Sequence, residues 1–134
     1  MSDRRAETIY DLIGEDGFTR LLAGFYRRVA ADALLRPLYP EDDLAPAERR
    51  LRLFLIQYFG GAPTYSAERG HPRLRMRHMP YAIGMAERDA WVRAMLAALD
   101  EAAIPEPAYS EMKHYFEDGA TFLINAPSYG EGVG

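Results

Sequence analysis

The spacing of the apolar residues predicts an all-α fold. In four long segments, apolar side chains recur three and four positions apart, which places them on one face of an α-helix. Proline or glycine stands near the boundaries of these segments, where helices end. The chain has neither the apolar–polar alternation of strands nor a hairpin signal. With 49% hydrophobic residues, residues 1–134 are expected to form a single domain.

Two helices are predicted near the N-terminus. Thr8 can cap a short helix over residues 8–13, and Gly14 can end it. Asp16 then opens a long helix that runs to about residue 32. The apolar face of this long helix is expected to contain Phe18, Leu21, Leu22, Phe25 and Val29.

A corner with two prolines, residues 34–40, separates this helix from the next one. The carboxylates of residues 41–43 are expected to form a solvated turn. Pro46 suits the first turn of the following helix, and Gly60-Gly61 ends it. Three arginines of this helix, Arg49, Arg50 and Arg52, are expected to point mostly outward, and its apolar face contains Ala47, Leu51, Phe54, Leu55 and Tyr58.

The middle of the chain has little regular periodicity. Residues 62–73 show no helical pattern, and a short turn over residues 74–78 leads to Pro80. Irregular stretches of this size inside a compact domain are usually either functional or disordered, and the apolar and aromatic side chains here favour the former: Tyr65, Leu74, Met76, Tyr81 and Ile83. The sequence therefore predicts a functional segment here.

Two further helices are predicted in the second half of the chain. One covers residues 87–101 and carries Trp91, Met95 and Leu99 on one side. The other covers residues 108–125, where its pattern stops just before Pro127. The ends of the chain, residues 1–7 and 128–134, are expected to be flexible.

Composition excludes several classes of protein and site. The chain has no cysteine, so it can form neither a disulfide nor a thiolate metal site. No apolar run approaches the ~20 residues that span a bilayer, and the N-terminus lacks a signal-peptide core. A net charge of −4 argues against general nucleic-acid binding. We therefore expect a cytoplasmic protein without a membrane or nucleic-acid partner.

The segment from Arg69 to Pro80 holds two of the three histidines and four arginines. A neutral imidazole such as that of His78 is a good axial ligand for haem iron, and the guanidinium of Arg77 suits a haem propionate. A surface or capping histidine is the ordinary alternative for His78. His71 can either bond a propionate or cap the next turn, and both possibilities stay open.

Three aromatic hydrogen-bond donors, Tyr26, Tyr39 and Trp91, lie at or near the apolar faces of separate elements. Each can bond a backbone carbonyl, or all three can converge on one small polar ligand. The sequence does not decide between these alternatives. Motifs for a zinc protease, a phosphate loop, a dinucleotide site or a nucleophile elbow are absent. His114, in the last helix, is expected to be exposed.

Together these residues resemble the truncated haemoglobins, and within them the group II branch. The resemblance covers Tyr10 to about Pro127. Its most specific parts are Phe25-Tyr26, Tyr39-Pro40-Glu41-Asp42, Gly60-Gly61, the run from Tyr65 to His78, and Glu87-Arg88-Asp89-Ala90-Trp91.

The resemblance implies a two-over-two helical sandwich around haem b. It implies that His78 is the proximal iron ligand and that Tyr26, Tyr39 and Trp91 donate hydrogen bonds to the bound ligand on the distal side. Ala47 takes the distal-helix position, where its small side chain leaves an open entry. His71 and Arg77 are implied contacts at the haem edge. The implied apolar haem contacts are Leu51, Phe54, Met76, Met79, Ile83 and Met95.

The resemblance also implies binding of O2 and other diatomic ligands at ferrous haem. Three donors would slow the loss of O2, which favours redox or detoxification chemistry of O2, nitric oxide or peroxide over bulk transport. Enzymatic forms of this chemistry are a haem-dependent dioxygenase and a peroxidase-like activity. Candidate protein partners are a reductase and a second copy of the chain in a homodimer.

Two alternatives to gas binding stay open at this point. The first is a helical binding module without cofactor that uses the cluster from Arg69 to Arg77 for an anionic partner. The second is a haem sensor or carrier, which would lose its haem easily.

Overall fold

The structure is a computed structural model and describes residues 7–69 and 84–121. In these residues the chain forms the α-helices α1 (Ile9–Ala31), α2 (Ala45–Tyr58), α3 (Thr64–Arg69), α5 (Met85–Glu101) and α6 (Ala108–Thr121), and the 3-10 helix η1 (Arg36–Leu38). No strand occurs in the described parts of the chain. The prediction of an all-α fold is therefore confirmed.

The N-terminal end of α1 follows the predicted capping and breaking signals. The Thr8 hydroxyl accepts from the backbone N–H of Asp11 at 3.0 Å, and the Asp11 carboxylate accepts from the N–H of Thr8 at 3.0 Å. Gly14 has φ 67° and ψ 175°, a conformation that interrupts the helix and suits glycine best. The two predicted helices therefore meet at a kink, with only this one residue between them.

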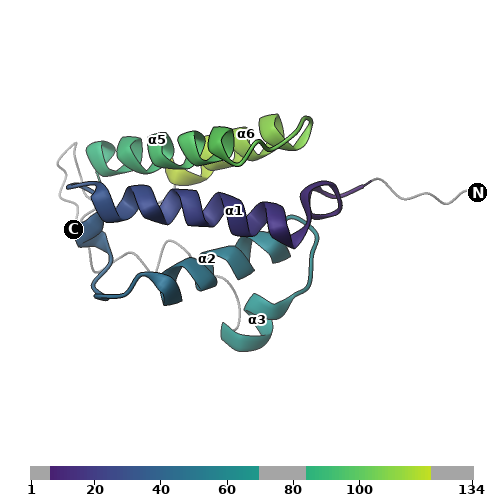
Figure 1. Cartoon of the computed structure of the whole chain (residues 1–134), viewed down its shortest axis with the longest axis horizontal. Coiled ribbons are helices and arrows are strands. Elements are labelled where there is room, and N and C mark those ends of the chain that lie inside the picture. Colours follow the sequence, from purple (N-terminus) through teal and green to yellow (C-terminus); the bar gives the residue numbers. More distant parts are fainter. Residues whose placement is uncertain (1–6, 70–83, 122–134) are drawn as a thin grey trace, which may run out of the picture.

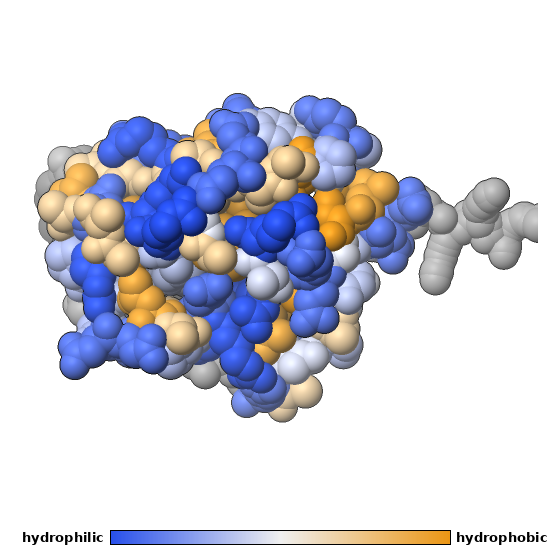
Figure 2. Space-filling model, viewed as in Figure 1, coloured by the Kyte–Doolittle hydropathy of each residue, from blue (hydrophilic) through white to orange (hydrophobic). Residues whose placement is uncertain are grey.

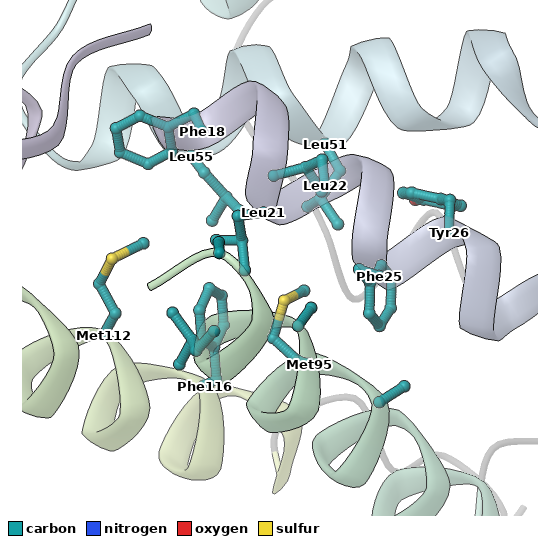
Figure 3. Close-up of a cluster of buried hydrophobic side chains, with 14 of the residues drawn as sticks. Phe18, Leu21, Leu22, Phe25, Tyr26, Leu51, Leu55, Met95, Met112 and Phe116 are labelled. Atoms are coloured by element: carbon teal, nitrogen blue, oxygen red, sulfur yellow. The ribbon is translucent and has the colours of Figure 1, made fainter. Parts of the chain in front are cut away.

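Helix α1 lies between the other helices (Figure 1). It packs against α5 and α6 on one side and against α2 on the other, and α3 lies beyond α2. The predicted apolar face of α1 is fully buried in this core: Phe18, Leu21, Leu22, Phe25 and Val29. Figure 3 shows side chains of this face opposite Met95, Met112 and Phe116. Burial of each such side chain stabilises the fold by roughly 1.5–3 kcal/mol.

Helix α3 was not predicted, because six residues are too few to show a period. Polar contacts with α2 hold it. The Gln57 amide donates to the Ser66 hydroxyl at 2.7 Å and accepts from the Ser66 N–H at 2.9 Å. Arg49 and Glu68 form a bidentate ion pair at 2.9 and 2.8 Å. Tyr65 points inward from α3 and is buried.

Helix α5 begins at Met85, two residues before the predicted start. Gly84 precedes it, and the Glu87 carboxylate accepts from the N–H of Gly84 at 3.0 Å. This bond satisfies one of the backbone N–H groups that a helix start leaves without a partner. The prediction missed this start because Gly84 does not have a capping side chain.

Hydrophilic residues cover much of the face shown in Figure 2, with smaller apolar patches between them. Among the helices that the structure describes, none is both long enough and apolar enough to cross a bilayer.

Candidate functional site

The three predicted donors lie next to one another in the structure. Tyr26 comes from α1, Tyr39 directly follows η1, and Trp91 comes from α5. Tyr26 and Trp91 are only 5% and 8% exposed. The rings of Tyr26 and Tyr39 meet edge to face at 5.6 Å between centroids. Phe25 contacts both Tyr26 and Trp91, at 5.0 and 5.2 Å between centroids.

The hydrogen bonds of this cluster meet at the hydroxyl of Tyr39. Burial raises the pKa of Tyr26 well above its ordinary value, and the charge interaction and hydrogen bond with Tyr39 raise it further. Burial also raises the pKa of Tyr39, while hydrogen bonds with Tyr26 and Trp91 act in the opposite direction. The indole N–H of Trp91 can only donate, so Trp91 donates to the Tyr39 hydroxyl, which also shares a hydrogen bond with Tyr26.

Helix α2 contributes an apolar wall to the site. Ala47 and Leu51 are buried, with 2% and 9% exposure, and Phe54 is partly buried. These three residues are four and three positions apart, so they share one side of the helix. Phe54 meets the ring of Tyr65 edge to face at 5.4 Å between centroids. Met95, one turn after Trp91 on α5, is fully buried in the core.

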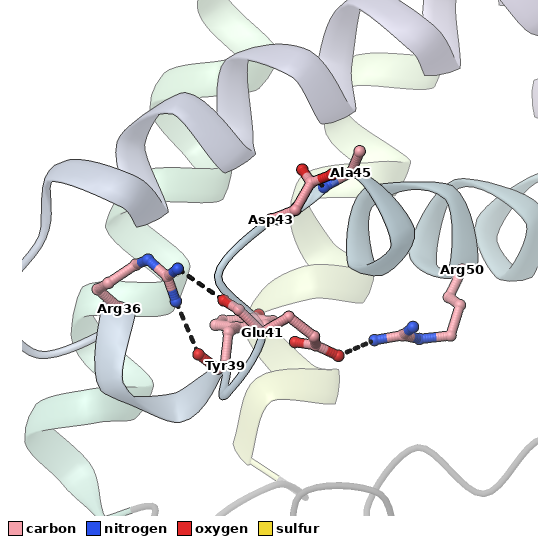
Figure 4. Close-up of polar contacts among 6 residues, drawn as sticks. All are labelled: Arg36, Tyr39, Glu41, Asp43, Ala45 and Arg50. Carbon is pink, nitrogen blue, oxygen red and sulfur yellow. Dashed lines mark hydrogen bonds and ion pairs between the residues drawn. The ribbon is translucent and has the colours of Figure 1, made fainter.

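The chain between η1 and α2 is fixed by arginines (Figure 4). One guanidinium, that of Arg36, donates to the carbonyl oxygens of Tyr39 and Glu41, both at 2.7 Å, and of Asp42 at 3.2 Å. Arg50 of α2 forms an ion pair with Glu41 at 2.9 Å. At the start of α2, the Asp43 carboxylate accepts from the N–H of Ala45 at 3.0 Å.

The turn over residues 41–43 is therefore only partly solvated, and the prediction for Glu41 and Arg50 was wrong. Both side chains are about one-third exposed, and the Oε1 of Glu41 is buried without a hydrogen-bond partner. Burial by itself would raise the pKa of Glu41. Hydrogen bonds from its own backbone N–H and from Arg50, together with the charges of Arg50 and Arg36, outweigh this effect and lower the pKa.

The remaining predicted haem contacts and the predicted iron ligand lie outside the described residues: His71, Met76, Arg77, His78, Met79 and Ile83. Within the described parts, no group of three or more histidine, aspartate and glutamate side chains could hold a metal ion. His114 is 79% exposed and lies 3.0 Å from the Asp118 carboxylate, so its predicted exposure is confirmed.

Sequence reasoning missed Arg36 as part of this region, and it treated Tyr65 only as a residue of the irregular middle segment and not as a contact of Phe54. Arg36 interrupts the otherwise apolar corner of residues 34–38, which is a weak signal for an inward polar role. Its bonds to three backbone carbonyls depend on how the following residues turn back, which is not visible in a sequence. Tyr65 lies in the short helix that has no detectable period.

A family model described as "Bacterial-like globin" matches residues 8–124 of the chain. The chain belongs to this family.

Similar solved globins come from several bacteria. A hemoglobin from the thermophilic phototrophic bacterium Chloroflexus aurantiacus is 56% identical, with a TM-score of 0.86 over 90% of this chain and 99% of that one. A thermostable hemoglobin from Thermobifida fusca is 54% identical, with a TM-score of 0.87 over 91% of this chain and 100% of that one.

Two relatives of this globin identify its branch within the family. The group 2 truncated hemoglobin YjbI of Bacillus subtilis is 43% identical over 95 residues, which are 71% of each chain. The group II truncated hemoglobin of Bacillus anthracis is 31% identical, with a TM-score of 0.87 over 97% of this chain and 98% of that one. The chain is therefore a globin of the group II truncated branch, and membership in this family supports haem-based gas binding.

The described residues of the globin fit one face of a haem group. A cluster of three donors, two of which meet at the hydroxyl of Tyr39, suits a small polar ligand, and the side of α2 that carries Ala47, Leu51 and Phe54 suits an apolar ring. Among the described residues, these donors and this wall come from α1, α2, α5 and the turn after η1.

Proposed function

We propose that the chain binds haem b through His78 and holds O2 and other diatomic ligands on the side of Tyr26, Tyr39 and Trp91. The observation that supports this proposal is the convergence of Tyr26 and Trp91, from two separate helices, on the hydroxyl of Tyr39. Haem, when bound, supplies an iron that takes a diatomic ligand and exchanges electrons. The chain supplies donors, apolar walls and charge partners.

In this proposal, Tyr39 is the residue that donates to the ligand. Both Tyr26 and Trp91 share hydrogen bonds with the Tyr39 hydroxyl, and the Trp91 N–H, which can only donate, donates to it. A hydroxyl that accepts a hydrogen bond is also a stronger donor, because hydrogen bonds in a chain polarise one another. A donor fixed in advance stabilises negative charge on a bound ligand without reorganisation.

The apolar residues have a different role in this proposal. Ala47 leaves space for the ligand to enter and adds no donor of its own, while Leu51 and Phe54 exclude water. The further apolar contacts to the ring are Met76, Met79, Ile83 and Met95, and Arg77 and His71 bond the propionates. Water exclusion strengthens the hydrogen bonds of Tyr39, because a low dielectric screens them less.

Strong retention of the ligand favours chemistry on it over transport. We infer that the chain acts on O2, nitric oxide or peroxide, as a dioxygenase or a peroxidase-like enzyme, with electrons from a reductase in the cytoplasm. A similar globin from Bacillus subtilis, 37% identical with a TM-score of 0.84 over 89% of this chain and 100% of that one, is described as oxygen-avid. This description of a relative agrees with slow ligand loss here.

The test is an absorption spectrum of the purified chain in its ferric, ferrous and O2-exposed forms. We expect a Soret band that shifts on reduction and again on O2 binding. His78→Ala should abolish the wild-type spectra, whereas His114→Ala should preserve them, because His114 is an exposed histidine on α6. A chain that stays colourless after addition of hemin would overturn the proposal and favour a cofactor-free module.

A further inference from the structure

We propose that Arg36 is a positioning residue that holds Tyr39 where its hydroxyl meets Tyr26 and Trp91. The inference deepens the proposed function and rests on it for the role of Tyr39 toward the ligand. The structural part rests only on the contacts of Arg36 and on the hydrogen bonds of Tyr39.

The segment that carries Tyr39 lacks regular structure of its own. Tyr39 has φ −118° and ψ 107°, an extended conformation, and residues 39–44 form neither helix nor strand before α2 begins at Ala45. In such a segment, backbone carbonyls need partners from elsewhere. One guanidinium provides them: Arg36 bonds the carbonyl oxygens of Tyr39 and Glu41 through two different nitrogens and reaches that of Asp42 as well.

Arg36 is itself fixed to the end of α1. Its backbone N–H donates to the carbonyl of Asp32 at 2.9 Å. The Asp32 carboxylate accepts from the N–H groups of Leu34 and Leu35 at 2.8 and 3.1 Å, and the Leu35 side chain is fully buried. The position of Arg36 is therefore set by the same helix that carries Tyr26.

These contacts connect the C-terminal end of α1, through Arg36 and Tyr39, back to Tyr26 on the same helix. The chain leaves α1, passes through Arg36, and returns the side chain of Tyr39 to Tyr26 of α1. Hydrogen bonds weaken steeply when their angle deviates, so two bonds that converge on one oxygen require the backbone beneath it to stay in place. Because Arg36 bonds the carbonyl of Tyr39 itself, it acts at the residue whose position matters.

The geometry requires arginine in particular. A guanidinium is planar and presents five N–H donors in a fixed fork, whereas a lysine ammonium is a single point on a flexible stem. Lysine at this position would keep the positive charge near Glu41 but would not bridge the carbonyls of Tyr39 and Glu41 from two nitrogens. This difference separates a positioning role from a purely electrostatic one.

The experiment compares Arg36→Ala and Arg36→Lys with Arg20→Ala as the matched control. Arg20 also bonds a backbone carbonyl, that of Ala102 at 3.1 Å, but at the far end of α5. The first readout is the indole N–H resonance of Trp91 in a proton–nitrogen NMR spectrum, which is unambiguous because the chain has one tryptophan. Tyr39→Phe, which removes the acceptor, gives the reference shift. The second readout is the O2 dissociation rate.

We expect both Arg36 variants to move the indole resonance toward its position in Tyr39→Phe, and Arg20→Ala to leave it unchanged. Arg36→Ala should also speed O2 release by about three- to tenfold, the effect of one weakened hydrogen bond. If Arg36→Ala does not fold, Arg36→Lys decides. An indole resonance at its wild-type position in a folded Arg36 variant would overturn the inference.

The two readouts separate this inference from the proposed function. The indole resonance requires neither haem nor gas, so it reports on Arg36 even if the chain proves not to bind O2. Conversely, normal O2 binding together with an unmoved indole resonance would reject the role of Arg36 and leave the proposed function intact.

Discussion

The two sides of α1 are held together by different forces. Toward α5 and α6, the contacts are mainly apolar and buried, as for Phe25, Met95 and Phe116. Polar contacts with α5 occur at its C-terminal end, where Arg20 and Arg28 of α1 bond Ala102 and Glu101. Toward η1, α2 and α3, a buried apolar seam is supplemented by polar contacts with partly exposed side chains, such as those of Arg36 and Gln57. Tyr26 and Trp91 belong to the first side and Tyr39 to the second. The candidate site therefore lies where a rigid core meets a segment fixed by hydrogen bonds.

This difference teaches which donor is most sensitive to its surroundings. Tyr26 and Trp91 are held by close packing, which tolerates little movement. Tyr39 depends on a few directional bonds, so single polar substitutions can displace it. Four predictions test this comparison.

The largest effect is expected from the core side. Phe25→Ala should lower the free energy of unfolding by about 3–5 kcal/mol, because Phe25 is fully buried and its loss leaves a cavity beside Tyr26 and Trp91. Phe54→Ala, the same change at a partly exposed phenylalanine on α2, should cost about half as much. Urea unfolding measures the free energy of unfolding of both variants. An equal loss in the two variants would contradict the view that the core side of α1 is the more tightly packed.

The next effect concerns the donors. Tyr39→Phe should speed O2 dissociation by about 10- to 100-fold, the equivalent of a strong hydrogen bond to a charged acceptor of about 1.5–3 kcal/mol. Tyr26→Phe and Trp91→Phe should each speed it less, because both residues act through Tyr39. Stopped-flow measurement of O2 release gives the order. An unchanged O2 dissociation rate in Trp91→Phe would show that the Trp91 N–H does not affect the bound ligand. A larger effect of Tyr26→Phe than of Tyr39→Phe would assign the hydrogen bond to the ligand to Tyr26.

A third prediction concerns the attachment of α3. Gln57→Ala removes both hydrogen bonds to Ser66 and should destabilise α3 locally by about 1–2 kcal/mol. Hydrogen exchange of the amides of residues 64–69 should become about tenfold faster, while amides of α5 keep their wild-type rates. Ser66→Ala should produce a smaller change, since the N–H of Ser66 still bonds Gln57. Equal rates in all three proteins would show that the packing of Tyr65 and the Arg49–Glu68 ion pair hold α3 without the bonds of Gln57.

The smallest effect is expected at Glu41, and it depends on pH. The pKa of Glu41 is lower in the folded chain than its ordinary value of 4.5, so its charged form is favoured by folding. This stabilisation is present above the ordinary pKa and is lost as the pH falls through the lowered pKa of the folded state. Glu41→Gln should therefore cost under about 1 kcal/mol at neutral pH, since the ion pair is partly exposed.

Urea unfolding across a pH series tests the prediction for Glu41. The difference between wild type and Glu41→Gln should shrink as the pH is lowered below about 4.5. The matched control is Asp42→Asn, which removes the carboxylate of an exposed neighbour and leaves the ion pair of Glu41 with Arg50 intact. A difference that stays constant down to acid pH would mean that the carboxylate charge plays no part.

The sequence alone predicted features that depend on neighbours along the chain. The buried face of α1, the Thr8 cap and the break at Gly14 follow from the helical period and from residue types at helix ends, and the structure confirms them. The fold class follows from the same local patterns, whereas the family came from the resemblance of particular motifs to the truncated haemoglobins. The choice of Tyr26, Tyr39 and Trp91 as site residues came from the family resemblance.

Only the tertiary structure decided how these residues meet. The sequence left open whether the three donors bond separate carbonyls or converge, and convergence depends on the packing of α1 against α5 and on the path of residues 36–44. It also did not predict the contacts of Glu41, Arg36 and α3, because their partners are carbonyls and side chains brought together by that path. Periodicity records which face of a helix is apolar; it contains no information on where a hydroxyl on one element meets a donor on another.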